Sequence, residues 1–285
     1  MNVVLSVQEM REISEKVRRS GDTIALVPTM GALHEGHLAL VREAARQSSR
    51  VTVSIFVNPT QFGPNEDFER YPRDLEGDLR KLGKLKVDHV FVPDAASMYA
   101  KDAETRVELA RLPNHLCGLN RVGHFSGVAT VVLKLFNICR PDVAVFGLKD
   151  YQQVRVIEKM VADLDVPVRV VRHPTVREPD GLAMSSRNAY LSAEERARAP
   201  VIYATLRRMA EAVGRGEKDP EALVRSGRAR IEEAMGKVEY LSVVDPDTLD
   251  DVQVVDRPVV IAAAVRFGNT RLIDNVMAEP GKGLK

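Results

Sequence analysis

Val27–Leu40 reads V-P-T-M-G-A-L-H-E-G-H-L-A-L and is the stretch that decides the fold. The apolar run Thr23–Val27 predicts a strand before it, and the spacing of apolar residues from Leu38 onward predicts a helix after it. A helix N-terminus behind a glycine-bearing turn binds anions, because the first amides of a helix have no partner within the helix. We therefore expect an anion-binding turn here, with His34 and His37 beside it.

Strands and helices alternate outward from this turn. The predicted strands after it lie at 51–57, 87–92, 142–147 and 168–171, with a further short strand at 105–110. The predicted helices are one that Ser6 caps and Gly21 ends, and those at 37–47, 73–82, 127–138 and 150–164. This alternation favours an α/β fold, an open parallel sheet with helices on both faces. Polar loops at 28–37, 58–71 and 147–153 follow strands, where such sheets bind ligands.

The pattern changes near residue 175. Ser192 with Glu195 predicts a capping box for a helix to about Val213, and Asp219 precedes another helix that ends near Gly236. Strands are predicted at 238–244, 259–265 and 270–277, with a hairpin turn at 268–269. We expect a first domain at 1–175 and a smaller α+β C-terminal domain at 176–285.

Composition excludes several classes of protein. The chain has 285 residues, 45% hydrophobic and 28% charged, with a net charge of +1, so nothing favours binding to nucleic acid or to a membrane. No apolar run reaches the roughly 18 residues of a membrane span, and the N-terminus lacks the pattern of a signal peptide. The two cysteines, Cys117 and Cys139, lack metal-site spacing. We expect a cytoplasmic protein with free thiols.

The turn itself differs from the common nucleotide-binding motifs. Gly31–Leu38 reads G-x-x-x-x-G-H-L, which has the glycine spacing of a P-loop without its Lys and Ser/Thr, and it is not G-x-G-x-x-G. Two imidazoles could instead donate hydrogen bonds to a phosphate whose charge grows in a transition state. The alternative is that His34 and His37 are satisfied turn or cap residues, although a pair framed by glycines favours phosphate ligands.

Further strings carry a resemblance. H-x-G-H resembles the signature of the nucleotidylyl-transferase superfamily. The strings V-P-T-M-G-A-L-H-E-G-H-L, S-I-F-V-N-P-T-Q-F, Y-P-R, H-F-S-G-V, F-G-L-K-D-Y-Q-Q, D-G-L-A-M-S-S-R-N and R-L-I-D-N, in this order from 23 to 276, resemble the pantothenate synthetase family. The resemblance implies a Rossmann-like N-terminal domain, a smaller C-terminal lid domain and a homodimer.

The resemblance also implies an activity. It is the ATP-dependent condensation of (R)-pantoate with β-alanine to pantothenate, AMP and pyrophosphate, through a pantoyl adenylate and with Mg²⁺ accompanying the phosphates. The implied ATP-binding residues are Pro28, Thr29, Met30, Gly31, Ala32, Leu33, His34, Glu35, Gly36, His37, Arg121, Gly147, Leu148, Lys149, Asp150, Val176, Met184, Ser185, Ser186 and Arg187. Those implied to be catalytic are His37 (as proton donor), His34, Lys149 and Arg187.

The resemblance assigns finer roles to some of these positions. Asp150 is implied to accept from the ribose hydroxyls, Val176 to contact adenine through its backbone, and Ser185–Arg187 to grip phosphate. Gln61 and Gln153 are implied to bind pantoate, and Gln61 also β-alanine. Neutral amides would hold pantoate without fixing its carboxylate in an ion pair.

Two positions depart from the family pattern. Leu148 stands where the family usually has a polar residue, so only a backbone contact is expected there. Gly77-Asp78 stands where an adjacent acidic pair is common, which leaves Asp78 as the candidate ligand of Mg²⁺, with ATP itself as the alternative main holder of the metal.

Alternatives remain for individual residues. Arg121 could be a surface arginine, His124 could cap a helix, and His89 is expected to be structural. The acidic run 66–69 is expected to be a solvated loop face.

Other activities fit the sequence less well. A nucleotidylyl transferase would need a basic acceptor site rather than Gln61 and Gln153, and a nucleotide sensor has little need of Lys149 and Arg187. A nicotinamide-dependent oxidoreductase would need the missing glycine fingerprint.

Overall fold

A computed structural model describes residues 1–64 and 66–284, which divide into two compact units. The first unit comprises Met1–Ala110, Arg121–Leu148 and Gln153–Pro174. The second comprises Arg111–Asn120, Lys149–Gln152 and Thr175–Lys285. The predicted first domain included 111–120 and 149–152, which the structure groups with the C-terminal residues. The two-domain division at 175 stays a prediction.

The first unit contains a six-stranded sheet in the order β1-β4-β3-β2-β5-β6, and every pairing in it is parallel. Its strands are β1 (Asn2–Val4), β2 (Ile24–Thr29), β3 (Arg50–Ile55), β4 (His89–Phe91), β5 (Val143–Gly147) and β6 (Arg169–His173). The predicted α/β class is therefore confirmed. The strand order reverses between β2 and β5, so the turn after β2 lies at a switch point, where open α/β sheets bind ligands.

Helices connect these strands. Those that lie wholly or mostly in the first unit are α1 (Val7–Arg19), α2 (Glu35–Gln47), α3 (Leu75–Leu82), α4 (Ala95–Met98), α6 (His124–Cys139) and α7 (Tyr151–Asp163). Leu40, Val41 and Ala44 of α2 pack on Ala25 and Val27 of β2. The alternate side chains of β2 point to the opposite face, where α6 contacts the strand and α1 contacts α6.

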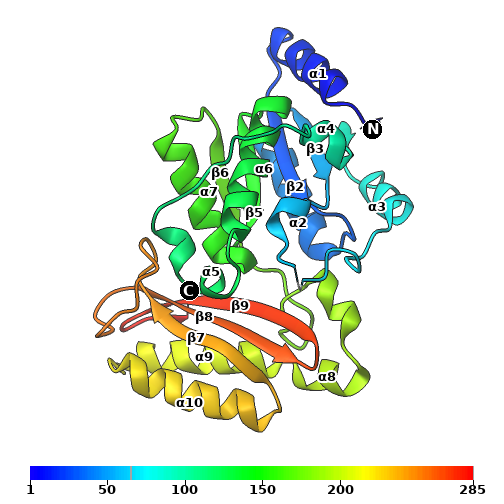
Figure 1. The fold of residues 1–285 in the computed structure, drawn as a ribbon. Coiled ribbons are helices and arrows are strands. Elements are labelled where there is room, and N and C mark those ends of the chain that lie inside the picture. The colour runs from blue at the N-terminus through cyan, green and yellow to red at the C-terminus, as the bar shows by residue number, and fades with distance from the viewer. Residues whose placement is uncertain (65, 285) are drawn as a thin grey trace. The chain divides into compact units, whose positions relative to one another are not determined.

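The second unit contains an antiparallel sheet in the order β10-β9-β8-β7. Its elements are α5 (Cys117–Asn120), α8 (Ala193–Arg198), α9 (Val201–Gly214), α10 (Pro220–Glu233), β7 (Lys237–Val244), β8 (Val259–Phe267), β9 (Thr270–Glu279) and β10 (Gly283–Leu284). Figure 1 shows α9 and α10 along one face of this sheet, and the contacts of α9 with β9 and of α10 with β7 agree. The predicted hairpin at 268–269 joins β8 to β9, and Phe267 faces Thr270.

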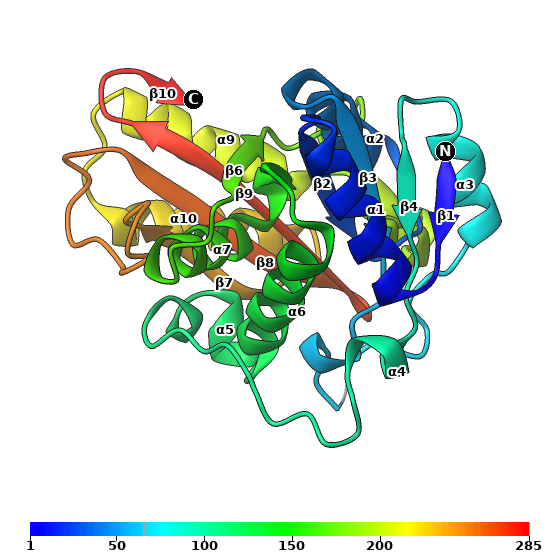
Figure 2. The ribbon, with the colours of Figure 1, turned by 90° about the horizontal axis from the view of Figure 1, so that it is seen from above.

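Three sequence expectations were wrong or incomplete. Residues 105–110 form no strand, and the backbone N–H of Val107 instead donates to the Thr130 hydroxyl at 2.9 Å. The single helix expected from Ser192 to Val213 is two helices that meet at Pro200, whose ring cannot supply a helical N–H. β1 was not predicted, and Figure 2 shows it beside β4, with which it pairs.

No helix among residues 1–64 and 66–284 has both the length and the apolar character that a membrane crossing requires. Cys117 and Cys139 are buried and free, as expected. Burial raises the pKa of the Cys139 thiol to about 12, which keeps that thiol protonated.

Candidate active site

The turn after β2 is tightly folded. The Thr29 hydroxyl donates to the carbonyl of Ser54 at 2.8 Å and accepts the N–H of Gly31 at 3.2 Å. Gly31 and Ala32 both have left-handed backbones, with φ of 85° and 50°. A left-handed residue with a side chain is strained, so this conformation needs support from its surroundings. The turn then enters α2 at Glu35.

His34 and His37 form a capping box at the start of α2. Nδ1 of His34 accepts the N–H of Gly36 at 3.2 Å, and Nδ1 of His37 accepts the N–H of His34 at 3.3 Å. The two ring centroids are 4.1 Å apart. A nitrogen that accepts carries no proton, so in this arrangement both rings are neutral and carry hydrogen on Nε2. Both histidines therefore act as cap residues through Nδ1, and the hydrogen of each ring lies on Nε2; that they bind phosphate stays a prediction.

The start of α3 supports the same turn. Asp78 is buried, and its Oδ1 accepts the N–H of Leu33 at 2.7 Å. Asp74 caps α3 through the N–H of Gly77 at 2.9 Å, and a Cβ at Gly77 would lie 1.9 Å from Asp74 Oδ2. A side chain at position 77 would therefore require Asp74 to move. Among the described residues, no group of three or more His, Cys, Asp and Glu side chains could hold a metal ion, and the assignment of Asp78 to Mg²⁺ stays a prediction.

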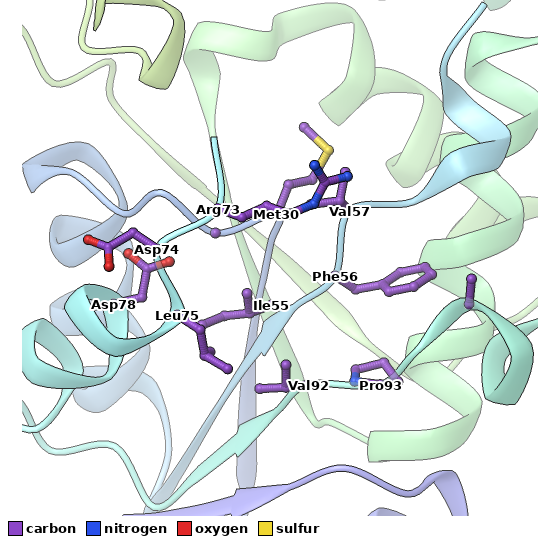
Figure 3. Close-up of a pocket in the computed structure, with 12 residues that line it drawn as sticks. Met30, Ile55, Phe56, Val57, Arg73, Asp74, Leu75, Asp78, Val92 and Pro93 are labelled. Carbon is purple, nitrogen blue, oxygen red and sulfur yellow. The ribbon is translucent and has the colours of Figure 1, made fainter. Parts of the chain in front are cut away.

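A pocket of about 280 Å³ lies beyond the carboxyl ends of β2, β3 and β4 (Figure 3). It is lined by Met30, Gly31, Ile55, Phe56, Val57, Arg73, Asp74, Leu75, Asp78, Val92, Pro93 and Ala95. Figure 3 shows the carboxylates of Asp74 and Asp78 together on the α3 side of the pocket. The guanidinium of Arg73 donates to the carbonyls of Phe68, Glu69 and Tyr71, so it orders the loop before α3.

Gln61 contacts Met30 and Asn58, and the sequence indicated no role for Asn58. Its Oε1 accepts from Asn58 Nδ2 at 3.1 Å, and its Nε2 lies 3.2 Å from Met30 Sδ. Asn58 is 1% exposed and also donates to the carbonyl of Gly127, while its Oδ1 accepts from Tyr99 Oη at 2.8 Å. In the sequence, Asn58 stands out only as part of the string N-P-T-Q-F. No residue spacing indicates a role for Tyr99. The predicted residues Met30 and Gln61 are therefore brought together.

Arg121 lies in a polar network rather than on the surface. Its guanidinium donates to both carboxylate oxygens of Glu66, at 2.5 and 2.7 Å, and lies 2.9 Å from His124 Nε2. Because a guanidinium only donates, His124 Nε2 must accept, so Nδ1 carries the proton and donates to the carbonyl of Gln61 at 2.7 Å. The expectation of a capping His124 is therefore wrong, because no described side chain forms a cap hydrogen bond at the start of α6. In the run 66–69, expected to be a solvated loop face, Glu69 is exposed but Glu66 is ion-paired and half-buried. That Arg121 binds ATP phosphate stays a prediction.

Glu66 is ionised over a wide pH range in this network. Burial alone would raise the pKa of its carboxyl, but the hydrogen bonds and positive charge of Arg121 outweigh it and hold the pKa below the usual value. The ion pair is therefore kept at neutral pH and fastens the loop that contains Gln61.

Lys149 and the 176–187 segment lie in the second unit and are anchored on β9. Asn275 Nδ2 donates to the carbonyl of Lys149 at 2.9 Å, and Lys149 Nζ lies 3.0 Å from Asp150 Oδ2. Asp274 accepts two hydrogen bonds from Arg177, at 2.6 and 3.0 Å. The string R-L-I-D-N, whose individual residues had no assigned role, thus supplies both anchors.

The 176–187 segment folds back on itself. The N–H of Met184 donates to the carbonyl of Val176 at 3.0 Å, and Ser185 Oγ accepts the N–H of Arg187 at 3.3 Å. Arg187 and Ser186 begin a short 3-10 helix, Ser186–Tyr190. These predicted residues are therefore neighbours on one loop.

The remaining predicted residues lie at the end of β5 and the start of α7. Gly147 is the last residue of β5, and Leu148 begins a 3-10 helix, Leu148–Asp150. Gln153 lies in the first turn of α7 and is half-buried. Its neighbour Gln152 is buried and bonds to the backbone of Cys117 and Leu112, so Gln152 has a structural role.

Comparisons with known proteins agree with this geometry. A family model described as pantoate-β-alanine ligase matches residues 2–277. A pantothenate synthetase of Thermotoga petrophila is 50% identical over 280 residues, 97% of this chain and 99% of that protein. A pantothenate synthetase of Pseudomonas entomophila is 50% identical over 278 residues, 97% of each chain.

Solved structures give the same result. The pantothenate synthetase of Thermus thermophilus superposes with a TM-score of 0.92 at 45% identity and covers 98% of this chain and 100% of its own. The pantoate-β-alanine ligase of Francisella tularensis, solved with β-γ ATP and β-alanine, gives 0.80 at 35% identity, over 96% and 97% of the two chains. Matches of this identity along almost the whole length leave one conclusion, that this chain belongs to the pantoate–β-alanine ligase family.

Proposed function

We propose that this chain condenses (R)-pantoate with β-alanine, using ATP, to give pantothenate, AMP and pyrophosphate through a pantoyl adenylate. The observation that carries the proposal is the capping box of His34 and His37 at the N-terminus of α2. It offers two neutral imidazole donors and the positive end of a helix beyond the switch point of a parallel sheet. Such a site suits a triphosphate that must be approached by a carboxylate.

In the first step, a pantoate carboxylate oxygen forms a bond to the α-phosphorus of ATP. The bond between that phosphorus and the bridging oxygen breaks, and pyrophosphate leaves with the electron pair. Negative charge grows on the phosphate oxygens, and the Nε2–H groups of His34 and His37 donate to them. Donors that are already in place when charge develops lower the barrier most.

We also assign residues of the second unit to the negative phosphates of ATP. Lys149 and Arg187 supply cations, and Ser185 and Ser186 supply hydroxyl groups suited to pyrophosphate oxygens. Asp150 would accept from the ribose hydroxyls, and the backbone at Val176 would meet adenine. β9 supports this assignment, because Asp274 holds Arg177 of the 176–187 segment and Asn275 holds the backbone of Lys149.

In the second step, the β-alanine amine attacks the acyl carbon of pantoyl adenylate, and AMP leaves with the electron pair of the acyl–oxygen bond. Gln61 and Gln153 would hold the pantoyl group through neutral amides, and Gln61 would also meet β-alanine. The network of Glu66, Arg121 and His124 supports this role, because it fixes the backbone at Gln61. An amide does not form an ion pair with the carboxylate, so the oxygen stays nucleophilic.

Mg²⁺ would enter this site together with ATP. Mg²⁺ prefers oxygen ligands and is commonly held by substrate phosphates, water and one or two carboxylates. Asp78 offers a buried Oδ2 to which no described residue gives a hydrogen bond, and it is the residue that would hold the metal. The ion would supply charge neutralisation on the phosphates.

We also infer a cytoplasmic homodimer. Two buried, unpaired cysteines are typical of a reducing compartment, and the dimer is what membership of the family suggests. Sedimentation equilibrium at micromolar protein concentration tests the dimer, and a monomer at all concentrations would contradict it.

The decisive experiment is ATP–pyrophosphate exchange with pantoate present and β-alanine absent. The proposed adenylate predicts exchange that requires pantoate and then a net release of AMP when β-alanine is added. Exchange that ignores pantoate would overturn the acyl-adenylate mechanism.

A further inference from the structure

Both backbone polar groups of Leu33 are held by side chains of α3. The N–H of Leu33 donates to Asp78 Oδ1 at 2.7 Å, and Lys81 Nζ donates to the carbonyl of Leu33 at 2.7 Å. Asp78 and Lys81 are three residues apart on α3, so they lie on the same face, with Nζ 3.6 Å from Oδ1. We call this pair the α3 clamp.

The clamp acts where the turn needs support. Leu33 directly follows the left-handed pair Gly31 and Ala32 and directly precedes His34, the cap residue of α2. A strained turn persists only when its surroundings fix it. Without the clamp, residues 31–33 could relax and carry His34 away from its position.

Apolar packing also attaches α3 to the sheet. Leu79 and Leu82 of α3 pack in the same apolar cluster as Val53 of β3. A polar pair is an expensive way to add stability, because Asp78 is 1% exposed and no described residue gives its Oδ2 a hydrogen bond. Oδ1 is the oxygen that holds Leu33, so the hydrogen bond to Leu33 is separate from any role of Oδ2 toward a metal ion.

We propose that Asp78 and Lys81 are positioning residues that hold the turn at 28–37 in the shape that binds the phosphates of ATP. The proposal rests on the proposed function only in taking ATP as the anion. Asp78 fixes the N–H and Lys81 the carbonyl of the same residue, so the orientation of the Leu33 peptide groups is set before the nucleotide arrives. The cation of Lys81 also offsets the negative charge that Asp78 places near an anion site.

The test combines nucleotide binding with hydrogen exchange. We expect Asp78→Ala and Lys81→Met each to weaken binding of ATP by about 10-fold or more in calorimetry, as the loss of a charge-assisted hydrogen bond predicts, both with Mg²⁺ and in its absence, where a lost metal ligand has no effect. The Leu33 amide should exchange at least about 10-fold faster in Asp78→Ala. Asp78→Asn retains a carbonyl acceptor for Leu33 and should restore most of the protection.

Two controls lie on the same helix. Glu76→Gln and Arg80→Met change exposed side chains of α3 and should bind Mg–ATP as the unmodified protein does. Both clamp residues act on Leu33. The fold-loss of ATP affinity in the double variant Asp78→Ala/Lys81→Met should therefore be smaller than the product of the fold-losses in the two single variants. If Asp78→Ala does not fold, ATP binding and Leu33 exchange in Asp78→Asn and Lys81→Met test the clamp instead.

The outcomes separate this proposal from the proposed function. Folded clamp variants with unchanged Mg–ATP affinity and unchanged Leu33 exchange would overturn the clamp, even with pantoate-dependent exchange intact. Absence of pantoate-dependent exchange in the unmodified protein, with weakened binding of metal-free ATP and faster Leu33 exchange in the clamp variants, would overturn the reaction and leave the clamp.

Discussion

Nδ1 of His37 accepts the backbone N–H of His34, 3.3 Å away, so this ring is both a helix cap and a donor. The two tasks use opposite nitrogens of the same imidazole. The cap fixes the tautomer, and the tautomer leaves hydrogen on Nε2, where a phosphate can accept it. A substitution can therefore remove either task alone.

We predict that His37→Asn separates the two tasks. The amide oxygen of Asn can replace Nδ1 as the cap acceptor, but no atom replaces Nε2–H. The thermal midpoint should stay close to that of the unmodified protein, while pantoate-dependent ATP–pyrophosphate exchange falls by about 100-fold. His37→Ala should lose both properties. Normal exchange in His37→Asn would show that Nε2–H has no part in adenylation.

Lys149→Ala should lower the exchange rate by at least about 100-fold, because it removes a cation from the reacting phosphates. The fold should be unaffected, since Asn275 holds the backbone carbonyl of Lys149 and not its side chain. Lys282→Ala, which removes an exposed cation of the second unit, is the matched control. Equal rates in the two variants would contradict the role of Lys149.

Asp274→Ala should strongly destabilise the second unit. The carboxylate of Asp274 is 3% exposed and holds Arg177 in two hydrogen bonds. Removing one partner of a buried ion pair leaves an uncompensated charge, at a cost of about 3 kcal/mol. The free energy of unfolding in urea measures it. Glu221→Ala, which breaks an exposed pair with Arg225, should cost less than about 1 kcal/mol.

The ion pair of Glu66 predicts a pH dependence of stability. The pKa of Glu66 in the folded protein lies below its ordinary value of 4.5, so its contribution is complete above about pH 4.5 and is lost as the pH falls through the folded value. Glu66→Gln should therefore lower the thermal midpoint near neutral pH, and its difference from the unmodified protein should shrink in acid. A difference that is constant with pH would contradict the ion pair.

Much of the first unit could be predicted from local sequence. The strand at 23–27, the turn with its glycines and the helix after it follow from hydrophobic period and cap chemistry, and the parallel sheet follows from their alternation. The break at Pro200 could also have been predicted, because a proline inside a helical pattern ends the helix. Residues 105–110 look like a strand only because β-branched and apolar residues are common there.

Partners that are distant in sequence could not be predicted in the same way. Nothing in the sequence pairs Asp78 with Leu33, Glu66 with Arg121 or Asp274 with Arg177, because each contact depends on how elements pack. The motif strings contain most of these residues, but they do not say whether a residue meets the substrate or another residue of the protein.

The second unit is assembled from segments that are far apart in the sequence, and this affects the order in which it folds during synthesis. Residues 111–120 and 149–152 belong to it, yet they leave the ribosome long before β7 and β9 exist. Cys117 Sγ cannot meet Tyr240 Oη, 3.1 Å away in the folded protein, until Tyr240 has been synthesised. The carbonyl of Lys149 likewise has no bond from Asn275 until that residue has been added. A nascent chain stopped before residue 270 would therefore carry an N-terminal sheet with its anion-binding turn, but Lys149 would lack its anchor until the last strands had been made.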